Sequence, residues 1–132
     1  MSPAKRLACA PWVLLFVSTA FSAEAAETFR KLSGKQISAK LTGMEFSDEV
    51  HWREIYERGG SVRSYEMGRT REGKWRVAKD RLCVDLERTG NDNCYQLWMA
   101  GDRVEMRTEA DQKNPIAGIL RKPTDPVKRP KI

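Results

Sequence analysis

The strongest constraint on this chain comes from two cysteines on either side of a short polar loop. Cys83 and Cys94 flank residues 89–93 (TGNDN), within a stretch, residues 73–107, that alternates between apolar and polar side chains. If Cys83 lies opposite Cys94 in an antiparallel pair of strands, Leu82 lies opposite Tyr95 on the other face, where the apolar side chains gather. The cysteines and the alternation therefore select the same register independently. We expect a Cys83–Cys94 disulfide across a β-hairpin.

The first 25 residues have the features of a secretory signal peptide. Lys5 and Arg6 precede an apolar run, residues 7–17, and small residues follow, up to an A-x-A site that ends at Ala25. The run is shorter than the roughly 20 residues that a membrane-spanning helix needs, so we expect no membrane span after cleavage. An uncleaved N-terminal anchor is the alternative. Cleavage removes Cys9, the first of three cysteines, and leaves an even pair. This is typical of a periplasmic or secreted protein.

A short helix is predicted upstream of the paired cysteines. Ser33 can cap its N-terminus and Gln36 can complete a capping box, so the helix should begin at Gly34 and end before Gly43. A helix of about two turns is marginal alone and must pack against the rest of the fold. We expect it to plug an open end of the sheet or to pack along it.

Strand patterns follow the helix. Residues 45–57 and 62–67 are β-like, Gly59 and Gly60 indicate a hairpin turn between them, and residues 68–73 (GRTREG) resemble a charged turn. The pattern does not indicate which face of residues 52–57 is buried. Together with residues 73–107, the count is about seven strands in an antiparallel meander, which we expect to curl into a small lipocalin-like barrel. The fold class is therefore mainly β, with one short N-terminal helix.

The predicted domain of helix and barrel occupies residues 26–110. The alternation fades after that point, and residues 122–132 (KPTDPVKRPKI) combine three prolines with four basic side chains. We therefore expect residues 111–132 to form a disordered basic tail.

Residues suited to catalysis or metal binding are few. His51 is the only histidine, and Asp48 and Glu49 precede it, which permits the hypothesis of a hydrolase acting on envelope material. We expect no catalytic residue, because His51 lies in a strand pattern without a nucleophile motif nearby. Two cysteines and one histidine leave a zinc ligand missing, so we also expect no metal site and no cofactor.

Aromatic side chains are the more informative candidates for binding. Trp52, Trp75, Tyr95 and Trp98 lie on strand patterns, where they can line a barrel interior that binds an apolar small molecule, or can form the core. We select these four as the residues that contact a ligand or partner. The leading hypothesis is a non-enzymatic binding or interaction module of the cell envelope.

The charge of the chain permits a third hypothesis. Lys and Arg number 24 against 18 Asp and Glu, so the surface could bind an anionic lipid or a cell-wall polymer. Another envelope protein is a further possible partner. Export argues against nucleic acid as the natural partner.

Five segments stand in a characteristic order: LSGKQISAKLTG at residues 32–43, GKWRV at 73–77, RLC at 81–83, CY at 94–95 and GDRV at 101–104. In this order they resemble a family of small exported proteins of alphaproteobacteria, domain of unknown function 995. The resemblance implies a Gram-negative periplasmic setting and no established activity, so it transfers no catalytic residue. The chain departs from the family pattern at the first turn, where His51 and its neighbours replace a D-G-type hairpin.

Overall fold

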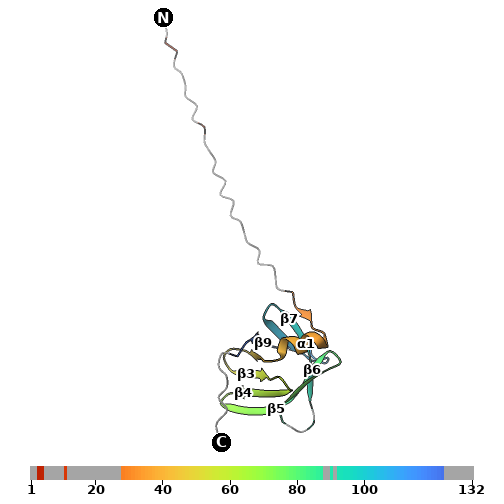
Figure 1. Cartoon of the computed structure of the whole chain (residues 1–132). Coiled ribbons are helices and arrows are strands. Elements are labelled where there is room, and N and C mark those ends of the chain that lie inside the picture. Colours follow the sequence, from red (N-terminus) through yellow and green to blue (C-terminus); the bar gives the residue numbers. More distant parts are fainter. Residues whose placement is uncertain (1–2, 5–10, 12–27, 88–89, 91, 124–132) are drawn as a thin grey trace.

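The computed structural model describes residues 28–87, 90 and 92–123, together with residues 3, 4 and 11. Most of the predicted signal peptide, including its cleavage site, lies outside the described residues. The elements of the described part, shown in Figure 1, are β1 (Arg30–Lys31), α1 (Gly34–Leu41), β2 (Met44–Ser47), β3 (Trp52–Tyr56), β4 (Ser61–Glu66), β5 (Arg69–Ala78), β6 (Arg81–Asp85), β7 (Asn93–Ala100), β8 (Arg103–Arg107) and β9 (Ile116–Arg121). None of its helices is long and apolar enough to cross a membrane.

Eight of these strands form a closed antiparallel barrel. Each strand from β2 to β9 pairs with the next along the chain, and β9 pairs with β2, which closes the ring. The short strand β1 pairs with Trp98 and Met99 of β7, in the part of β7 that does not pair with β6. The predicted fold class, an antiparallel meander that curls into a barrel with one short helix, is therefore confirmed. The barrel has eight strands where about seven were predicted.

The hairpin of β6 and β7 has the predicted register. Cys83 lies opposite Cys94, and Leu82 lies opposite Tyr95. The two cysteines form a disulfide, and their Cα atoms are 4.0 Å apart. Leu82 is completely buried in the core, so the disulfide is on the outer face of the sheet, because neighbouring residues of a strand point to opposite faces.

The helix closes one end of the barrel. Ser33 caps it and forms the predicted capping box with Gln36. The backbone N–H of Gly34 donates a 2.6 Å hydrogen bond to Oδ1 of Asp80, in the turn between β5 and β6. Ile37 and Leu41 are completely buried and join the core formed by the strands. Of the two expected arrangements, the helix as a plug is the one observed, and Figure 1 shows α1 lying across this end.

The strand that completes the barrel lies in the segment predicted to be a disordered tail. β9 pairs with β8, where Met106 lies opposite Ile116, and with β2, where Phe46 lies opposite Leu120. The predicted domain end at residue 110 is therefore wrong, and so is the tail prediction for residues 116–121. Residues 124–132 lie outside the described residues.

The short apolar pattern of β9 explains this error. Leu120 is its only buried side chain, so the strand has no clear alternation. Gly118 lies against the backbone of β2, because a Cβ at this position would be 2.5 Å from the carbonyl oxygen of Ser47. The strand is held by ladder pairing on both sides, and composition does not report such pairing.

The charged turn predicted at residues 68–73 is also wrong. The turn consists of Met67 and Gly68, which have φ angles of 46° and 79°. β5 begins directly after it, pairs with β4 through its first six residues, and then pairs with β6. Gly73 lies next to this change of partner, and an added Cβ would collide with the carbonyl oxygen of Asp85. The glycine lets the strand bend around the barrel, as glycines at barrel corners do.

Candidate functional site

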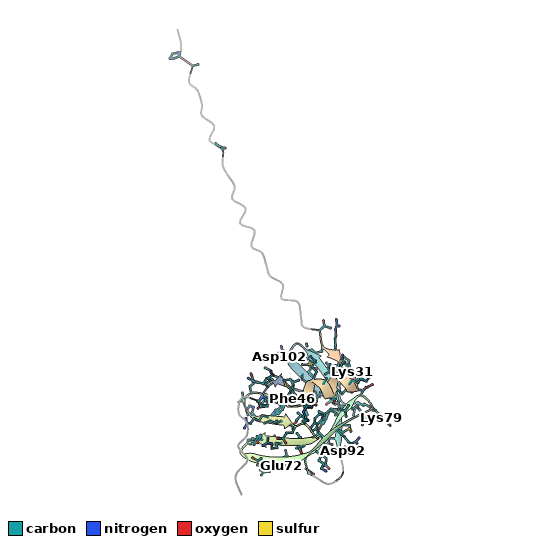
Figure 2. The ribbon with its side chains drawn as sticks, in the orientation of Figure 1. Lys31, Phe46, Glu72, Lys79, Asp92 and Asp102 are labelled. Carbon is teal, nitrogen blue, oxygen red and sulfur yellow. A yellow bond between two sulfur atoms is a disulfide. The ribbon has the colours of Figure 1, made fainter. Side chains whose placement is uncertain are left out.

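The barrel is packed at the helix end and hollow at the other end. A cavity of about 570 Å³ lies at the end where β2 connects to β3, β4 to β5, β6 to β7 and β8 to β9. This volume is in the range of small-molecule sites. Figure 2 labels Phe46 of β2, one of its lining residues, among the strands of the barrel. The sheet therefore surrounds both a packed core and a cavity.

Strand β3 supplies three residues of the cavity lining. Trp52, Glu54 and Tyr56 all line the cavity, because alternate residues of a strand share a face. The face of residues 52–57 that the sequence left undecided is therefore this one. β4 brings Ser64 opposite Glu54 and Glu66 opposite Trp52, so polar groups lie next to aromatic rings.

Aromatic rings form much of the apolar wall. The rings of Phe46 and Trp52 meet edge to face, with centroids 4.9 Å apart and an interplanar angle of 68°. Tyr95 adds a ring from β7. Tyr56 lines the cavity on one side and packs edge to face against Trp75 of the core on the other, with centroids 5.6 Å apart. The wall is therefore supported by packed side chains behind it.

Glu54 is the most unusual group of the cavity, because it is a largely buried carboxylate. Burial raises its pKa, and the nearby charge of Glu66 adds to this effect, while a hydrogen bond from the Tyr56 hydroxyl and the positive charge of Arg71 act in the opposite direction. Burial and the Glu54 charge together raise the pKa of Tyr56 well above its usual value. The same two causes raise the pKa of Tyr95. These phenols therefore stay protonated and can donate hydrogen bonds.

The rim of the cavity carries further charged groups. Nη2 of Arg71 lies 3.2 Å from Oε2 of Glu66, and both side chains are about half exposed. Asp85 and Glu87 add two carboxylates. In the described part of the lining, four carboxylates therefore accompany one guanidinium, although the chain as a whole has a formal charge of +6.

The four aromatic residues predicted to bind a ligand fall into three different places. Trp52 and Tyr95 line the cavity. Trp75 lies in the core, where its Nε1–H donates a 3.0 Å hydrogen bond to the carbonyl oxygen of Glu57. Trp98 points to the opposite face from its neighbour Leu97, a core residue, so it lies on the outer face of the sheet. The guanidinium carbon of Arg107 lies over its ring, 4.3 Å from the ring centroid.

His51 and its two acidic neighbours have separate partners. The imidazole is exposed, and its Nδ1 lies 2.8 Å from Oδ2 of Asp48. Oδ1 of Asp48 accepts hydrogen bonds from three backbone N–H groups, those of Val50, His51 and Trp52. Glu49 instead pairs with Arg121 of β9.

These contacts assign Asp48 to the loop itself. The hydrogen bond from the backbone N–H of Trp52 contributes most to lowering the pKa of Asp48, and the bonds from His51 and Val50 add to it. Among the described residues, one carboxylate and not two lies within hydrogen-bond distance of His51. The hydrogen bonds hold the loop between β2 and β3 together and fix the backbone of the cavity residue Trp52.

Several cavity residues were not selected from the sequence, chiefly Glu54, Ser64, Glu66 and Arg71. A signal for Glu54 was present, because it alternates with Trp52 and Tyr56 on one face of a strand. A carboxylate between two aromatic residues on a face that turns inward must be desolvated.

Comparisons of the chain with protein-family models, curated proteins and solved structures found no match. The resemblance to an alphaproteobacterial family stays a prediction. A functional assignment therefore depends on the geometry of the cavity.

Proposed function

We propose that this protein is a non-enzymatic binding protein that holds a small molecule in its barrel cavity, in the manner of a lipocalin. The observation that carries the proposal is the cavity of about 570 Å³, open at the end of the barrel away from α1 and lined by aromatic rings, other apolar side chains and several polar or charged groups. Small-molecule sites combine apolar walls, which supply affinity, with polar groups that orient the ligand, and both kinds of group are present here.

The proposed place of action is the periplasm or another oxidising compartment outside the cytoplasm. The Cys83–Cys94 disulfide supports this, because such bonds persist in oxidising environments. The signal-like pattern of residues 1–25 supports it independently. The hypotheses of an envelope hydrolase and of a polyanion-binding surface lack a comparable arrangement among the described residues.

A neutral fluorescent probe tests the proposal. N-phenyl-1-naphthylamine is titrated into the wild-type protein, and its emission should rise and saturate at one probe per chain. Trp52→Ala removes a cavity wall and should weaken binding by about tenfold or more. Trp98→Ala is the matched control, since this tryptophan lies on the outer face, and it should leave binding unchanged.

Circular dichroism of each variant verifies that the barrel is folded. The absence of saturable binding to the folded wild-type protein would overturn the proposal. Equal loss in the Trp52 and Trp98 variants would also count against it, because the probe would then bind at another surface. Native mass spectrometry of protein exported by a Gram-negative host adds a search for a co-purified ligand.

A further inference from the structure

Among the described residues that line the cavity, acidic side chains outnumber basic ones, whereas the chain as a whole is basic. Within that described lining, Arg71 is the only basic residue, whereas Glu54, Glu66, Asp85 and Glu87 all contribute carboxylates. Basic side chains exceed acidic ones in the whole sequence, so a random selection from this composition would favour a positive lining. The described lining therefore places more acidic than basic side chains where a ligand would enter.

Glu54 forms no salt bridge with another described residue, although the charge of Arg71 acts on it. The side chain of Glu54 accepts a hydrogen bond from the neutral hydroxyl of Tyr56. None of the salt bridges found between described residues involves Glu54. Arg71 instead bonds to Glu66 at the rim. A buried carboxylate without a paired cation is unfavourable, and a positively charged ligand would supply the missing charge.

The aromatic rings beside Glu54 suit the same kind of ligand. Trp52 lies two residues before Glu54 on the inner face of β3, and the charge of Glu54 acts on Tyr95 across the cavity. The face of an aromatic ring attracts cations, most strongly for tryptophan and for groups such as quaternary ammonium. A carboxylate between such rings provides both parts of an ammonium site.

An anionic ligand has fewer partners in the same space. Arg71 supplies the one guanidinium found among the described lining residues, and its Nη2 is already bonded to Glu66. A ligand carboxylate would have to compete with Glu66 for it and would also meet the charges of Glu54, Asp85 and Glu87. Like charges that share a low-dielectric site repel each other strongly.

We infer that the ligand of this cavity is an organic cation, an amine or quaternary ammonium group on an apolar body, with the Glu54 carboxylate as its counter-ion and the rings of Trp52 and Tyr95 around the charged group. This inference rests on the proposed function, since it names the class of ligand for the same cavity. No covalent step is involved.

Three compounds with one common body test it. 4-Phenylbutylamine, 4-phenylbutan-1-ol and 4-phenylbutyrate carry a cationic, a neutral and an anionic head group on the same phenylbutyl chain. Their dissociation constants are measured by calorimetry at neutral pH. The amine should bind the wild-type protein about tenfold or more tightly than the alcohol, and the butyrate should bind most weakly.

The matched variants remove one carboxylate each. Glu54→Gln keeps the size of the side chain and its hydrogen bond with Tyr56, and it should abolish the preference for the amine over the alcohol. Glu72→Gln makes the same change of charge at an exposed position of β5, outside the cavity lining, and Figure 2 labels Glu72 at the margin of the barrel. This control should keep the preference.

Each other outcome is informative. Equal binding of amine and alcohol, or tightest binding of the butyrate, would overturn the cationic ligand while leaving a binding cavity in place. A preference that persists in Glu54→Gln would overturn the role of Glu54. If none of the three compounds binds, and the neutral naphthylamine probe does not bind either, the proposed function itself fails.

Discussion

The hydroxyl of Tyr56 donates a hydrogen bond to the carboxylate of Glu54, which precedes it by two residues on the inner face of β3. The phenol is completely buried, and the carboxylate is largely buried. The bond links the packed core to the cavity, because Tyr56 also contacts Trp75. It satisfies the phenol, but it leaves the carboxylate with the cost of desolvation.

Glu54→Gln should stabilise the protein at neutral pH. Burial raises the pKa of Glu54, so the folded state disfavours its ionised form. The protonated group contributes its stability below the unfolded-state pKa, and this contribution is lost as the pH rises through the raised folded-state pKa. The amide carries no charge and avoids this loss. We expect the melting temperature of the variant to exceed that of the wild type by roughly a few degrees at neutral pH, and the difference to shrink in acid.

Differential scanning calorimetry at several pH values measures this difference. A lower melting temperature of the variant at neutral pH would mean that the ionised carboxylate gains more from the Tyr56 hydroxyl and the charge of Arg71 than its desolvation costs. Glu72→Gln serves as the control, because it changes the same charge at an exposed position.

The affinity for 4-phenylbutylamine should fall as the solution becomes acidic. The amine keeps its charge over this range, whereas protonation of Glu54 removes the proposed counter-ion. Because the pKa of Glu54 is raised, the decline should begin at a higher pH than that of an ordinary glutamate. Calorimetric titrations at a series of pH values test this, and a pH-independent affinity would contradict it.

Removal of the disulfide should lower stability without opening the barrel. The sequence separation of Cys83 and Cys94 is 11 residues, so the chain-entropy argument gives about 2–3 kcal/mol for the Cys83→Ser, Cys94→Ser double variant. The inner face, with Leu82 opposite Tyr95, keeps its register by apolar packing. Urea unfolding measures the loss, and reduction of the wild-type protein should reproduce it. A variant as stable as the wild type would contradict the prediction.

Leu120→Ala should destabilise the whole domain, although residue 120 lies in the segment predicted to be disordered. The side chain is 6% exposed and belongs to the core, so truncation should cost about 2–5 kcal/mol. Ala117→Ser, at an exposed position of the same strand, should cost little. Chemical denaturation distinguishes the two. Equal stabilities would mean that β9 does not close the barrel.

Asp48→Asn should loosen the loop between β2 and β3 at neutral pH. Three backbone N–H groups bond to the Asp48 carboxylate and lower its pKa. Such a group stabilises the fold above its unfolded-state pKa, and this stability is lost as the pH falls through the lower folded-state value. We therefore expect faster amide exchange in residues 50–52 of the variant at neutral pH and a smaller difference in acid. Asp102→Asn, in an exposed turn at the other end, is the control.

The features that the sequence predicted correctly depend on residues close together in the chain. The capping box joins Ser33 to Gln36, and the β6–β7 register joins Cys83 to Cys94 across one connection. In both cases side-chain chemistry and spacing define the partner without reference to the rest of the fold. Part of the site could be predicted in the same way, because Trp52, Glu54 and Tyr56 occupy alternate positions and so share one face of β3.

The role of each of these side chains required the closed barrel. The pattern left the face of Trp52 undecided, and its side chain lines the cavity. Trp98 shares the face of Cys94 in the predicted register, and it lies outside under Arg107. Trp75 also lies in an alternating pattern, and its side chain belongs to the core. Period-two alternation separates two faces of a strand without telling which one points inward.

Local spacing therefore determined the hairpin, the helix cap and the barrel class of this protein. The tertiary structure alone decided the closing strand, the inner face of β3 and the position of the cavity. The physical reason is that these depend on pairing between distant segments: β9 joins β2 where Leu120 lies opposite Phe46, and this pairing closes the barrel around the cavity that Glu54 lines.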